Sequence, residues 1–148
     1  MKFYSSAFAD QGKIPSHYTC DGLNVSPPLM IDDVPATAQS LTIIVYDPDA
    51  PSGDFVHWII WNISPINKQL SEDAFIPEAT QGTNDFGRTG WGGPCPPSGS
   101  HHYVFRLFAL DTALELPNTA TKVELRNAIE GHVLEEAQFS GNYQRLAK

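Results

Sequence analysis

One short stretch of the sequence, YDPDAPSGDFVHW at residues 46–58, combines side chains that could do chemistry. It places Asp47 and Asp49 in a D-x-D spacing directly after an apolar run, and it places His57 at the start of the next run. An aspartate can hold an imidazole ring in one tautomer and favour its charged form. The prolines between these groups stiffen the turn that holds them. Carboxylates and an imidazole gathered in this way are candidates for a binding, metal or catalytic site.

A second stretch, GPCPPSGSHHY at residues 93–103, ends in two adjacent histidines before another apolar run. Successive side chains of a β-strand point to opposite faces, so His101 shares its face with Tyr103. His102 shares the other face with Arg106, the charged residue inside this run. We expect the face of Arg106 to meet solvent, which predicts that His101 points inward and His102 outward.

Short apolar runs must position these groups. The runs at 40–47, 57–63 and 102–111 are rich in β-branched and aromatic residues and are bounded by Pro, Gly, Asp and Asn. The first two runs are nearly apolar on both faces, which is typical of central strands packed on both sides, and the third run is a further strand. Twelve prolines and 11 glycines punctuate the chain, at intervals typical of an antiparallel sandwich with long connections. We therefore expect an all-β sandwich of two antiparallel sheets.

One helix is predicted near the end of the sequence. Thr121 and Glu124 form a T-x-x-E capping box ahead of LRNAIEGHVLEEA. Gly131 weakens the middle of this helix by roughly 1 kcal/mol relative to alanine. We expect the C-terminal α-helix to have a packing role, with His132 on its surface or at a cap. Its predicted apolar stripe consists of Val123, Ile129, Val133 and Ala137.

Length and charge restrict the class of protein. The 148 residues fit one domain, 1–148, that can bury a core without a metal or disulfides. The formal net charge is −8 and the nine basic residues form no cluster, which argues against nucleic-acid binding. No run approaches the roughly 18 apolar residues of a membrane span, and the first residues lack the apolar core of a secretory signal. We expect a cytoplasmic protein without stable membrane insertion.

The two cysteines, Cys20 and Cys95, lie far apart in the sequence and match no CxxC zinc or thioredoxin pattern. In a reducing cytosol, two free thiols are the default expectation. Both residues lie in turn-rich segments that a sandwich could bring together, so a disulfide remains the alternative.

Three longer blocks carry a family resemblance. They are TCDGLNVSPPL (19–29), YDPDAPSGDFVHW (46–58) and NDFGRTGWGGPCPPSGSHHYVFRLFALD (84–111). In this order they resemble the signature blocks of the phosphatidylethanolamine-binding protein family, also called Raf-kinase-inhibitor-like proteins. The similarity runs from about residue 5 to residue 145, as in the short bacterial and archaeal members.

The resemblance implies a β-sandwich with a small pocket at one end that binds phosphate or phosphoryl headgroups. Asp47 matches the first aspartate of the family's D-P-D-x-P motif, His57 its following histidine, and His101 the histidine of its G-x-H-R block. It also implies a cis Ala50–Pro51 peptide bond. We expect no cofactor and no metal, and exposed sandwich edges together with the bacterial relatives favour a homodimer. The implied ligand-binding and wall residues are Asp47, Asp49, Pro51, His57, Trp58, Gly93, Pro96, Pro97, His101 and Tyr103.

The sequence departs from the family pattern at two places. His102 stands where the family has an arginine after the histidine of its G-x-H-R block, and a histidine lacks the permanent charge and planar fork of a guanidinium. The chain also ends soon after NYQRL, without the C-terminal helix that flanks the pocket in longer eukaryotic members. We therefore do not expect the kinase inhibition associated with those members.

Three other functions remain open. An inhibitor of a protease or another enzyme could act through the 77–100 loop, because loops of this length in small domains are usually functional. A metal-dependent hydrolase could use Asp47, Asp49, His57 and His101, although their spacing matches no compact ligand motif. A serine hydrolase could use Ser98 or Ser100, but PPSGSHH is not a G-x-S-x-G elbow. The leading expectation is a non-enzymatic small-anion-binding protein that modulates or inhibits a partner enzyme.

Overall fold

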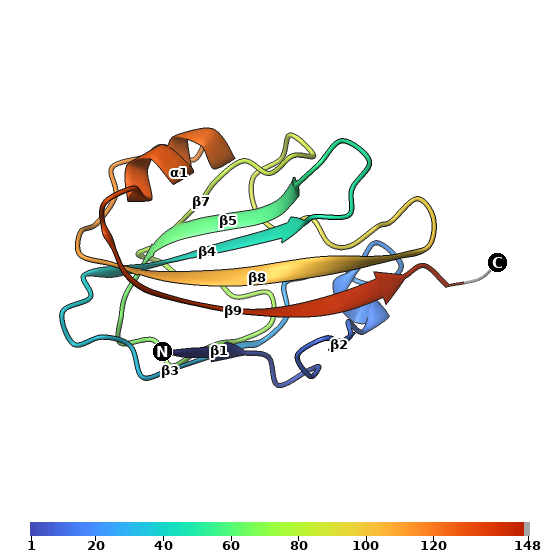
Figure 1. Ribbon diagram of the computed structural model, residues 1–148, viewed down its shortest axis with the longest axis horizontal. Coiled ribbons are helices and arrows are strands. Elements are labelled where there is room, and N and C mark those ends of the chain that lie inside the picture. Colours follow the sequence, from blue (N-terminus) through green and yellow to red (C-terminus); the bar gives the residue numbers. More distant parts are fainter. Residues whose placement is uncertain (147–148) are drawn as a thin grey trace.

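The computed structural model describes residues 1–146, which form two β-sheets and a single α-helix (Figure 1). The larger sheet has the strand order β2-β9-β8-β4-β5-β7 and the smaller sheet the order β1-β3-β6. Their strand pairs are antiparallel except that of β2 with β9. The predicted β-sandwich is therefore confirmed. The elements are β1 (Lys2–Tyr4), β2 (Gly12–Lys13), a 3₁₀ turn (Ser16–Tyr18), β3 (Leu29–Asp32), β4 (Ser40–Asp47), β5 (Phe55–Ile63), β6 (Gln69–Leu70), β7 (Thr80–Gln81), β8 (Ser100–Leu110), α1 (Lys122–Ile129) and β9 (Val133–Gln144).

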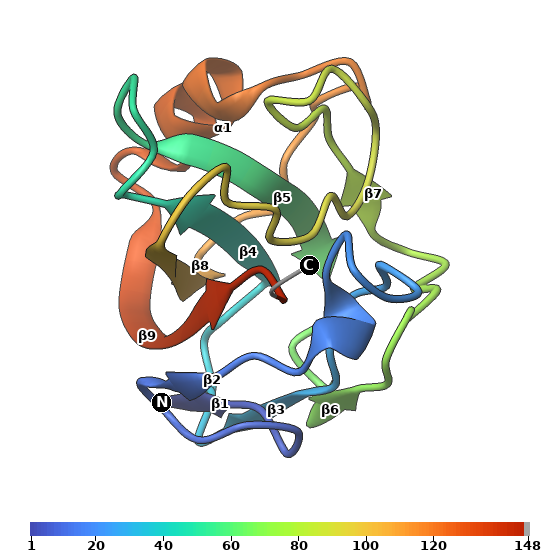
Figure 2. The same ribbon diagram turned by 90° about the vertical axis from the view of Figure 1, so that its right-hand side faces the viewer.

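The strands β4, β5 and β8 form the centre of the larger sheet. β4 and β5 are buried on both faces, as their apolar runs predict, whereas the first half of β8 alternates between buried and more exposed residues. One face packs against the smaller sheet, and the other packs under α1 and the segment before it. Figure 2 shows the two layers end-on, with α1 on the outer side of the larger sheet. On β8, for example, Phe105 and Leu107 face the interior between the sheets, whereas Phe108 and Leu110 face the helix. Burial on both faces explains why β4 and β5 lack a regular alternation of apolar and polar residues.

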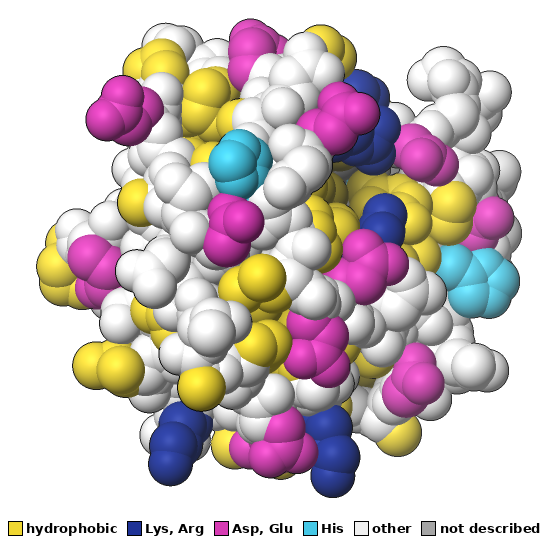
Figure 3. All heavy atoms as spheres, turned by 60° about the vertical axis from the view of Figure 1, so that its left-hand side comes forward, with side chains coloured by type: hydrophobic (Ala, Val, Ile, Leu, Met, Phe, Trp, Pro, Cys, Tyr) yellow, Lys and Arg dark blue, Asp and Glu magenta, His cyan; other side chains and the backbone are white. Residues whose placement is uncertain are grey.

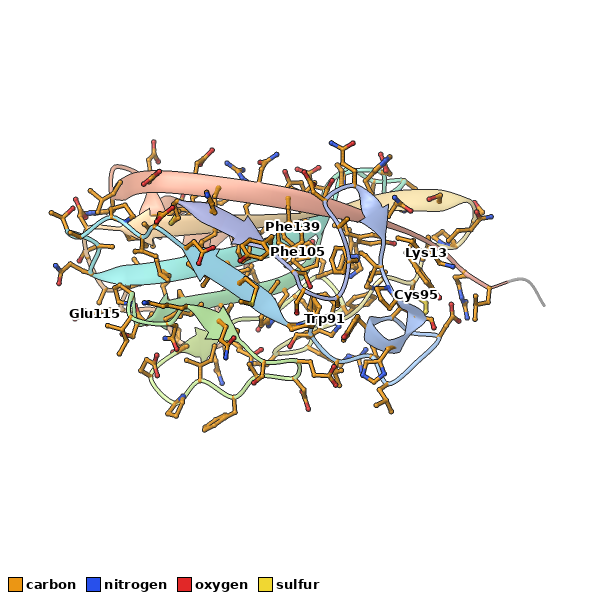
Figure 4. All side chains as sticks on the ribbon, turned by 90° about the horizontal axis from the view of Figure 1, so that it is seen from below. Lys13, Trp91, Cys95, Phe105, Glu115 and Phe139 are labelled. Carbon is orange, nitrogen blue, oxygen red and sulfur yellow. A yellow bond between two sulfur atoms is a disulfide. The ribbon has the colours of Figure 1, made fainter. Side chains whose placement is uncertain are left out.

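Aromatic rings fill the interior between the two sheets. Phe105 on β8 stacks on Phe139 of β9, with ring centroids 4.7 Å apart and an interplanar angle of 13°. Phe3 from β1 meets Phe139 edge-on at 5.0 Å, which joins the smaller sheet to the larger one. Figure 4 shows Phe105 and Phe139 in this interior, and Cys95 nearer to the end of the molecule at which β9 ends.

The predicted C-terminal helix is wrong over its second half. Helix α1 ends at Ile129, Gly131 has a φ of 82°, and residues 133–144 form strand β9. β9 pairs with β8 along nearly its whole length, so the long edge of β8 is covered by backbone hydrogen bonds. This pairing outweighs the helix propensity of the VLEEA segment, because tertiary context overrides such weak preferences. His132 therefore lies in the turn between the two elements, where Nδ1 contacts Asp111 at 2.7 Å.

The apolar face of α1 also differs from the predicted stripe. Val123 is 59% exposed, and the buried residues of the helix are Leu125 and Ile129. The predicted cap is present in part, since Thr121 is the N-cap residue and its hydroxyl donates to the Glu124 carboxylate at 2.6 Å. The hydrogen-bonded pair marks the helix start correctly even though the helix is short.

The segment between β7 and β8 is folded rather than open. Thr83 and Thr89 form an isolated antiparallel bridge, and the Asn84 side chain accepts from the backbone N–H groups of Phe86 and Arg88. The predicted long loop over 77–100 therefore contains a strand and a compact turn, which explains its length in so small a domain.

Within residues 1–146, no helix is long and apolar enough to cross a membrane. Basic side chains on the face shown in Figure 3 stand singly among acidic and apolar ones. That face therefore carries no basic patch of the kind that binds phosphate backbones.

Candidate functional site

A cavity of about 330 Å³ opens at the end of the larger sheet where β4 ends and β5 and β8 begin. This end lies on the right in Figure 1 and faces the viewer in Figure 2. The lining comes from the turn after β4, the first residues of β5 and β8, and the segment between β7 and β8. The lining residues are Asp47, Ala50, Pro51, Ser52, Phe55, His57, Phe86, Cys95, Pro96, Pro97, His101 and Tyr103. The two chemistry-bearing stretches of the sequence therefore meet around one space.

An irregularity in strand pairing brings His57 to the cavity. Val45 of β4 pairs with Trp58 of β5. The next residue, Tyr46, pairs with Val56, which leaves His57 as an extra residue on β5. A bulge of this kind re-aims the side chain of the inserted residue. His57 can therefore face the cavity while Trp58 packs in the core between the sheets.

The His57 ring is held through Nδ1, which lies 2.6 Å from the Gly92 carbonyl oxygen. A carbonyl oxygen only accepts, so Nδ1 carries a proton and Nε2 is the nitrogen left for the cavity. Burial holds the pKa of His57 below its ordinary value, although the Gly92 carbonyl and the Asp47 carboxylate act in the opposite direction. Neutral His57 therefore presents a lone pair on Nε2, and protonated His57 presents a second N–H donor.

The His101 ring is held by a carboxylate instead. Its Nδ1 lies 2.6 Å from Oδ2 of Asp47, and both side chains are buried. The other oxygen of Asp47 accepts the backbone N–H of Asp49 at 2.7 Å. Both oxygens of Asp47 are therefore engaged, and Nε2 of His101 is the ring nitrogen left for the cavity.

Tyr103 adds a hydroxyl without a protein partner. It is 1% exposed, and its hydroxyl forms no hydrogen bond with another group of the described chain. Its ring meets that of His57 edge-on at 5.2 Å. Burial raises the pKa of Tyr103, and the carboxylates of Asp47 and Asp49 raise it further. The phenol therefore keeps its proton at neutral pH and can donate to a ligand.

The rim of the cavity carries a second histidine–aspartate pair. Oδ2 of Asp49 accepts the backbone N–H of His102 at 2.8 Å and lies 2.7 Å from Nδ1 of the same residue. These hydrogen bonds from His102 hold the pKa of the Asp49 carboxyl below its usual value. The side chains are 63% and 42% exposed, so the pair faces solvent. His102 thus forms the hydrogen-bonded rim pair with Asp49 at the position where the family pattern has an arginine.

Two aromatic walls were missed in the sequence analysis. Phe55 and Phe86 line the cavity, with ring centroids 4.8 Å apart, and Phe86 also meets the edge of His57 at 5.3 Å. A Cβ atom on Gly92 would lie 2.5 Å from the Phe86 ring, so glycine lets this wall approach the carbonyl that holds His57. Phe55 could have been predicted, because it lies two positions before His57 on the same strand. No pattern in the sequence indicated that Phe86 lines the cavity.

A disulfide anchors another part of the cavity wall. Cys20 and Cys95 are bonded, with their Cα atoms 5.5 Å apart, and Cys95 lines the cavity. The default expectation of two free thiols is therefore wrong. The alternative expectation, a disulfide, is correct, because the sandwich brings the two turn-rich segments together.

The profile described as "Phosphatidylethanolamine-binding protein" matches residues 4–144. The chain belongs to the phosphatidylethanolamine-binding protein family. A UPF0098 protein from Methanothermobacter thermautotrophicus is 51% identical over 152 residues, covering 98% of this chain and 99% of that protein. A UPF0098 protein from Chlamydia muridarum is 43% identical over 150 residues, covering 98% and 99% of the two chains.

Solved structures of the phosphatidylethanolamine-binding protein family share this fold. A putative family homologue from Chlamydia trachomatis has a TM-score of 0.94 at 41% sequence identity, covering 98% of this chain and 97% of that chain. YbcL from E. coli, described as a new member of the mammalian family, has a TM-score of 0.92 at 28% identity, covering 98% of both chains. The sandwich is therefore common to bacterial members of the family.

Most of the ligand-binding residues implied by the family resemblance line the cavity, and three do not. Asp49 bonds to His102 at the rim, and Trp58 packs in the core between the sheets. The backbone N–H of Gly93 donates to Oδ1 of Asn24 at 2.8 Å, behind the wall. The Ala50–Pro51 peptide bond is trans, so the implied cis bond is wrong; trans is the lower-energy form of X–Pro bonds in general. The residues that line the cavity are Asp47, Pro51, His57, Pro96, Pro97, His101 and Tyr103.

A larger hollow of about 620 Å³ lies elsewhere, beside β3 and the 65–68 turn. It contains Lys2, Lys68 and two aspartates but no imidazole or buried polar group aimed into it. Over residues 1–146, no three His, Cys, Asp or Glu side chains are placed to hold a metal ion. The cavity at the ends of β4, β5 and β8 is therefore the stronger candidate site, although it is the smaller of the two.

Proposed function

We propose that this protein binds a small oxyanion, such as phosphate or a phosphoryl headgroup, in the cavity at the ends of β4, β5 and β8, and that it does so without chemical turnover. One observation carries the proposal. Two imidazole rings, each with Nδ1 already engaged, and an unpartnered tyrosine hydroxyl converge on one space of about 330 Å³. Buried polar groups that lack a protein partner are commonly completed by a ligand or by water.

The donors of the proposed site depend on protonation. The Tyr103 hydroxyl donates at any pH near neutrality, whereas Nε2 of His57 donates only when the ring is charged. Because burial lowers the pKa of His57, an oxyanion binds most tightly when the pH is low enough to protonate that ring. Sulfate keeps one charge state near neutrality, so its affinity reports the protein groups alone.

The shape of the cavity favours a headgroup over a whole lipid. A space of about 330 Å³ is at the lower end of small-molecule sites and is too small for two acyl chains. The walls beside the histidines are apolar, formed by Phe55, Phe86 and the prolines. A phosphoryl group would lie against the imidazoles, and a short organic substituent would lie along the rings and prolines.

The hydrogen bonds of the described residues do not favour a serine hydrolase. The Ser5 and Ser40 hydroxyls donate to backbone carbonyls, and within residues 1–146 no serine hydroxyl bonds to a histidine, the base that an activated serine nucleophile needs. Residues 97–100 beside the mouth of the cavity are exposed. A partner enzyme that contacts them could respond to whether the cavity is filled, which is how we propose that the protein modulates its partner.

Isothermal titration with sulfate tests the proposal. We expect measurable binding whose affinity falls as the pH rises from about 5.5 to 8, because Nε2 of His57 donates only while the ring is charged and burial lowers the pKa of that ring. His101→Gln should lower the affinity at pH 5.5 by about tenfold or more, because it removes the ring held by Asp47. The matched control is His102→Gln, at the neighbouring position on the opposite face of β8, which should change the affinity by less than about twofold.

A chelator should leave sulfate binding unchanged, because the proposal requires no metal. A sulfate affinity that is independent of pH in the parent protein would contradict the proposed role of the histidines. Equal losses from His101→Gln and His102→Gln would show that the cavity is not the binding site. Loss of binding on chelation, restored by zinc, would instead support the metal-dependent alternative.

A further inference from the structure

The segment of residues 95–99, which lines the cavity with Cys95, Pro96 and Pro97 and forms one of its walls, has an unusual attachment. Within the described chain, these residues make no hydrogen bond, and the disulfide at Cys95 is their link to another element. Pro96 is buried and lines the cavity, whereas residues 97–99 are exposed and Gly99 has a φ of 66°. The position of Pro96 and Pro97 over the cavity therefore depends on packing and on one covalent bond.

The other end of that bond lies on a firmly held loop. The neighbour of Cys20, Asp21, accepts the Tyr143 hydroxyl at 2.6 Å and pairs with Arg145 at 3.0 Å. On the other side, the Thr19 hydroxyl donates to the Ser16 carbonyl at 2.8 Å. Cys20 is therefore fixed to the end of β9 and to the 3₁₀ turn without help from the disulfide.

The chain on either side of the 95–99 wall is also held independently. The Pro94 carbonyl accepts the backbone N–H of Cys20 at 3.1 Å, and the Gly93 N–H donates to Asn24. A Cβ atom at Gly93 would collide with Asn24 and the Tyr18 carbonyl, so the two segments are in close contact there. From Ser100 onward the chain is paired in β8. Breaking the disulfide would therefore release this wall and leave the sandwich and both histidines in place.

We propose that the Cys20–Cys95 pair is a redox switch for the cavity: the oxidised protein holds the proline wall in place and binds an oxyanion tightly, and the reduced protein binds it more weakly. This inference rests on the proposed function. In the reduced protein the wall samples other positions, and a ligand must order it again on binding, which lowers the affinity. Both cysteines are partly exposed, so a small thiol reductant can reach them.

The switching reaction is thiol–disulfide exchange with a dithiol. One thiolate of the dithiol attacks a sulfur of the Cys20–Cys95 bond, which forms a mixed disulfide and releases the other cysteine as a thiolate. The second thiol of the reductant then closes its own disulfide and releases the remaining cysteine. Two electrons and two protons pass from the dithiol to the protein, so the products are two cysteine thiols and one cyclic disulfide.

Sulfate titrations at pH 5.5 of protein kept oxidised or fully reduced by dithiol test the switch. We expect reduction to weaken sulfate binding at least about fivefold. Because the chain has two cysteines, the double variant Cys20→Ser/Cys95→Ser is a matched control. It should bind as weakly as reduced protein, and reductant should not change its affinity. Its far-ultraviolet circular dichroism should match that of the parent, which shows that the sandwich is intact.

Linkage supplies a second measurement on the unaltered chain. If oxidised protein binds sulfate more tightly by a given factor, saturating sulfate must shift the thiol–disulfide equilibrium toward the disulfide by the same factor. Titration in a series of dithiol buffers, with and without sulfate, measures that shift. Chloride at matched ionic strength controls for a general salt effect.

Backbone mobility separates the switch from the proposed function. NMR order parameters of the amides at Cys95 and residues 98–99 should fall on reduction, while those of β4 and β8 remain unchanged. Equal sulfate affinities in the oxidised, reduced and double-variant proteins would overturn the switch and leave the proposed function standing. If oxidised protein binds no sulfate, the proposed function fails. Unchanged order parameters at Cys95 and residues 98–99 on reduction would show that the wall is not held by the disulfide.

Discussion

Two histidine–aspartate pairs lie side by side at one end of the molecule, one inside the cavity and one on its rim. His101 contacts Asp47 at 2.6 Å and His102 contacts Asp49 at 2.7 Å, through the same atoms of each side chain. The inner pair has side-chain exposures of 10% and 6%, and the outer pair has exposures of 63% and 42%. The two pairs therefore contain the same chemical groups and differ in how far their side chains are buried.

The alternation of β-strands explains why the pairs separate. His101 and His102 are neighbours on β8, so their side chains point to opposite faces. The two aspartates of the D-x-D motif lie one at the end of β4 and one in the turn beyond it, so each reaches a different histidine. The same local sequence therefore supplies an orienting pair for the cavity and a hydrogen-bonded pair in solvent. The comparison predicts unequal responses to equal substitutions.

The largest effect is expected when the carboxylate of the inner pair is removed. Asp47→Asn should lower the free energy of unfolding by about 2 kcal/mol, because the buried carboxylate accepts from His101 and from the backbone N–H of Asp49. Asp49→Asn, the matched change in the outer pair, should cost about 0–1 kcal/mol. Urea denaturation at pH 7 measures both values. Equal losses would mean that burial does not distinguish the two pairs.

An intermediate effect is expected from the third histidine, which has a carbonyl partner in place of a carboxylate. The folded-state pKa of His57 lies below its unfolded value, so below about pH 6.5 the unfolded chain takes up a proton that folded His57 does not. Stability should therefore fall as the pH drops from about 6.5 toward the folded pKa, with a slope of at most about 1.4 kcal/mol per pH unit. Above pH 6.5 this contribution should be constant.

His57→Gln removes the titrating group and should flatten that part of the stability profile, measured by urea denaturation between pH 5.5 and 7.5. His102→Gln provides the control, since its imidazole lies in solvent, and should leave the slope unchanged. A slope retained in His57→Gln would assign the proton uptake to another group.

The smallest effect is expected from strengthening the outer pair. His102→Arg restores the charge and fork geometry of the family's arginine opposite Asp49. Because the pair is exposed, the gain in unfolding free energy at pH 7 should be less than about 1 kcal/mol and should shrink further in 1 M salt. A gain that persists in high salt would show that the rim is shielded from solvent.

The sequence alone determined the central strands and the face of each histidine on β8. Strand periodicity and apolar composition are local properties, so the runs at 40–47 and 57–63 and the inward direction of His101 and Tyr103 could be predicted from neighbouring residues. The family blocks added the correct fold and most of the cavity lining.

Only the tertiary structure decided the fate of the chain after Gly131, where pairing with β8 replaced a predicted helix by β9. It also decided the bulge that turns His57 into the cavity, the approach of Phe86, and the bond between Cys20 and Cys95. Each of these depends on contacts between residues that are distant in the sequence. Local patterns report only the weak propensities of neighbouring residues. They do not contain the free energy of strand pairing, ring packing and covalent cross-linking between distant residues, which exceeds those propensities.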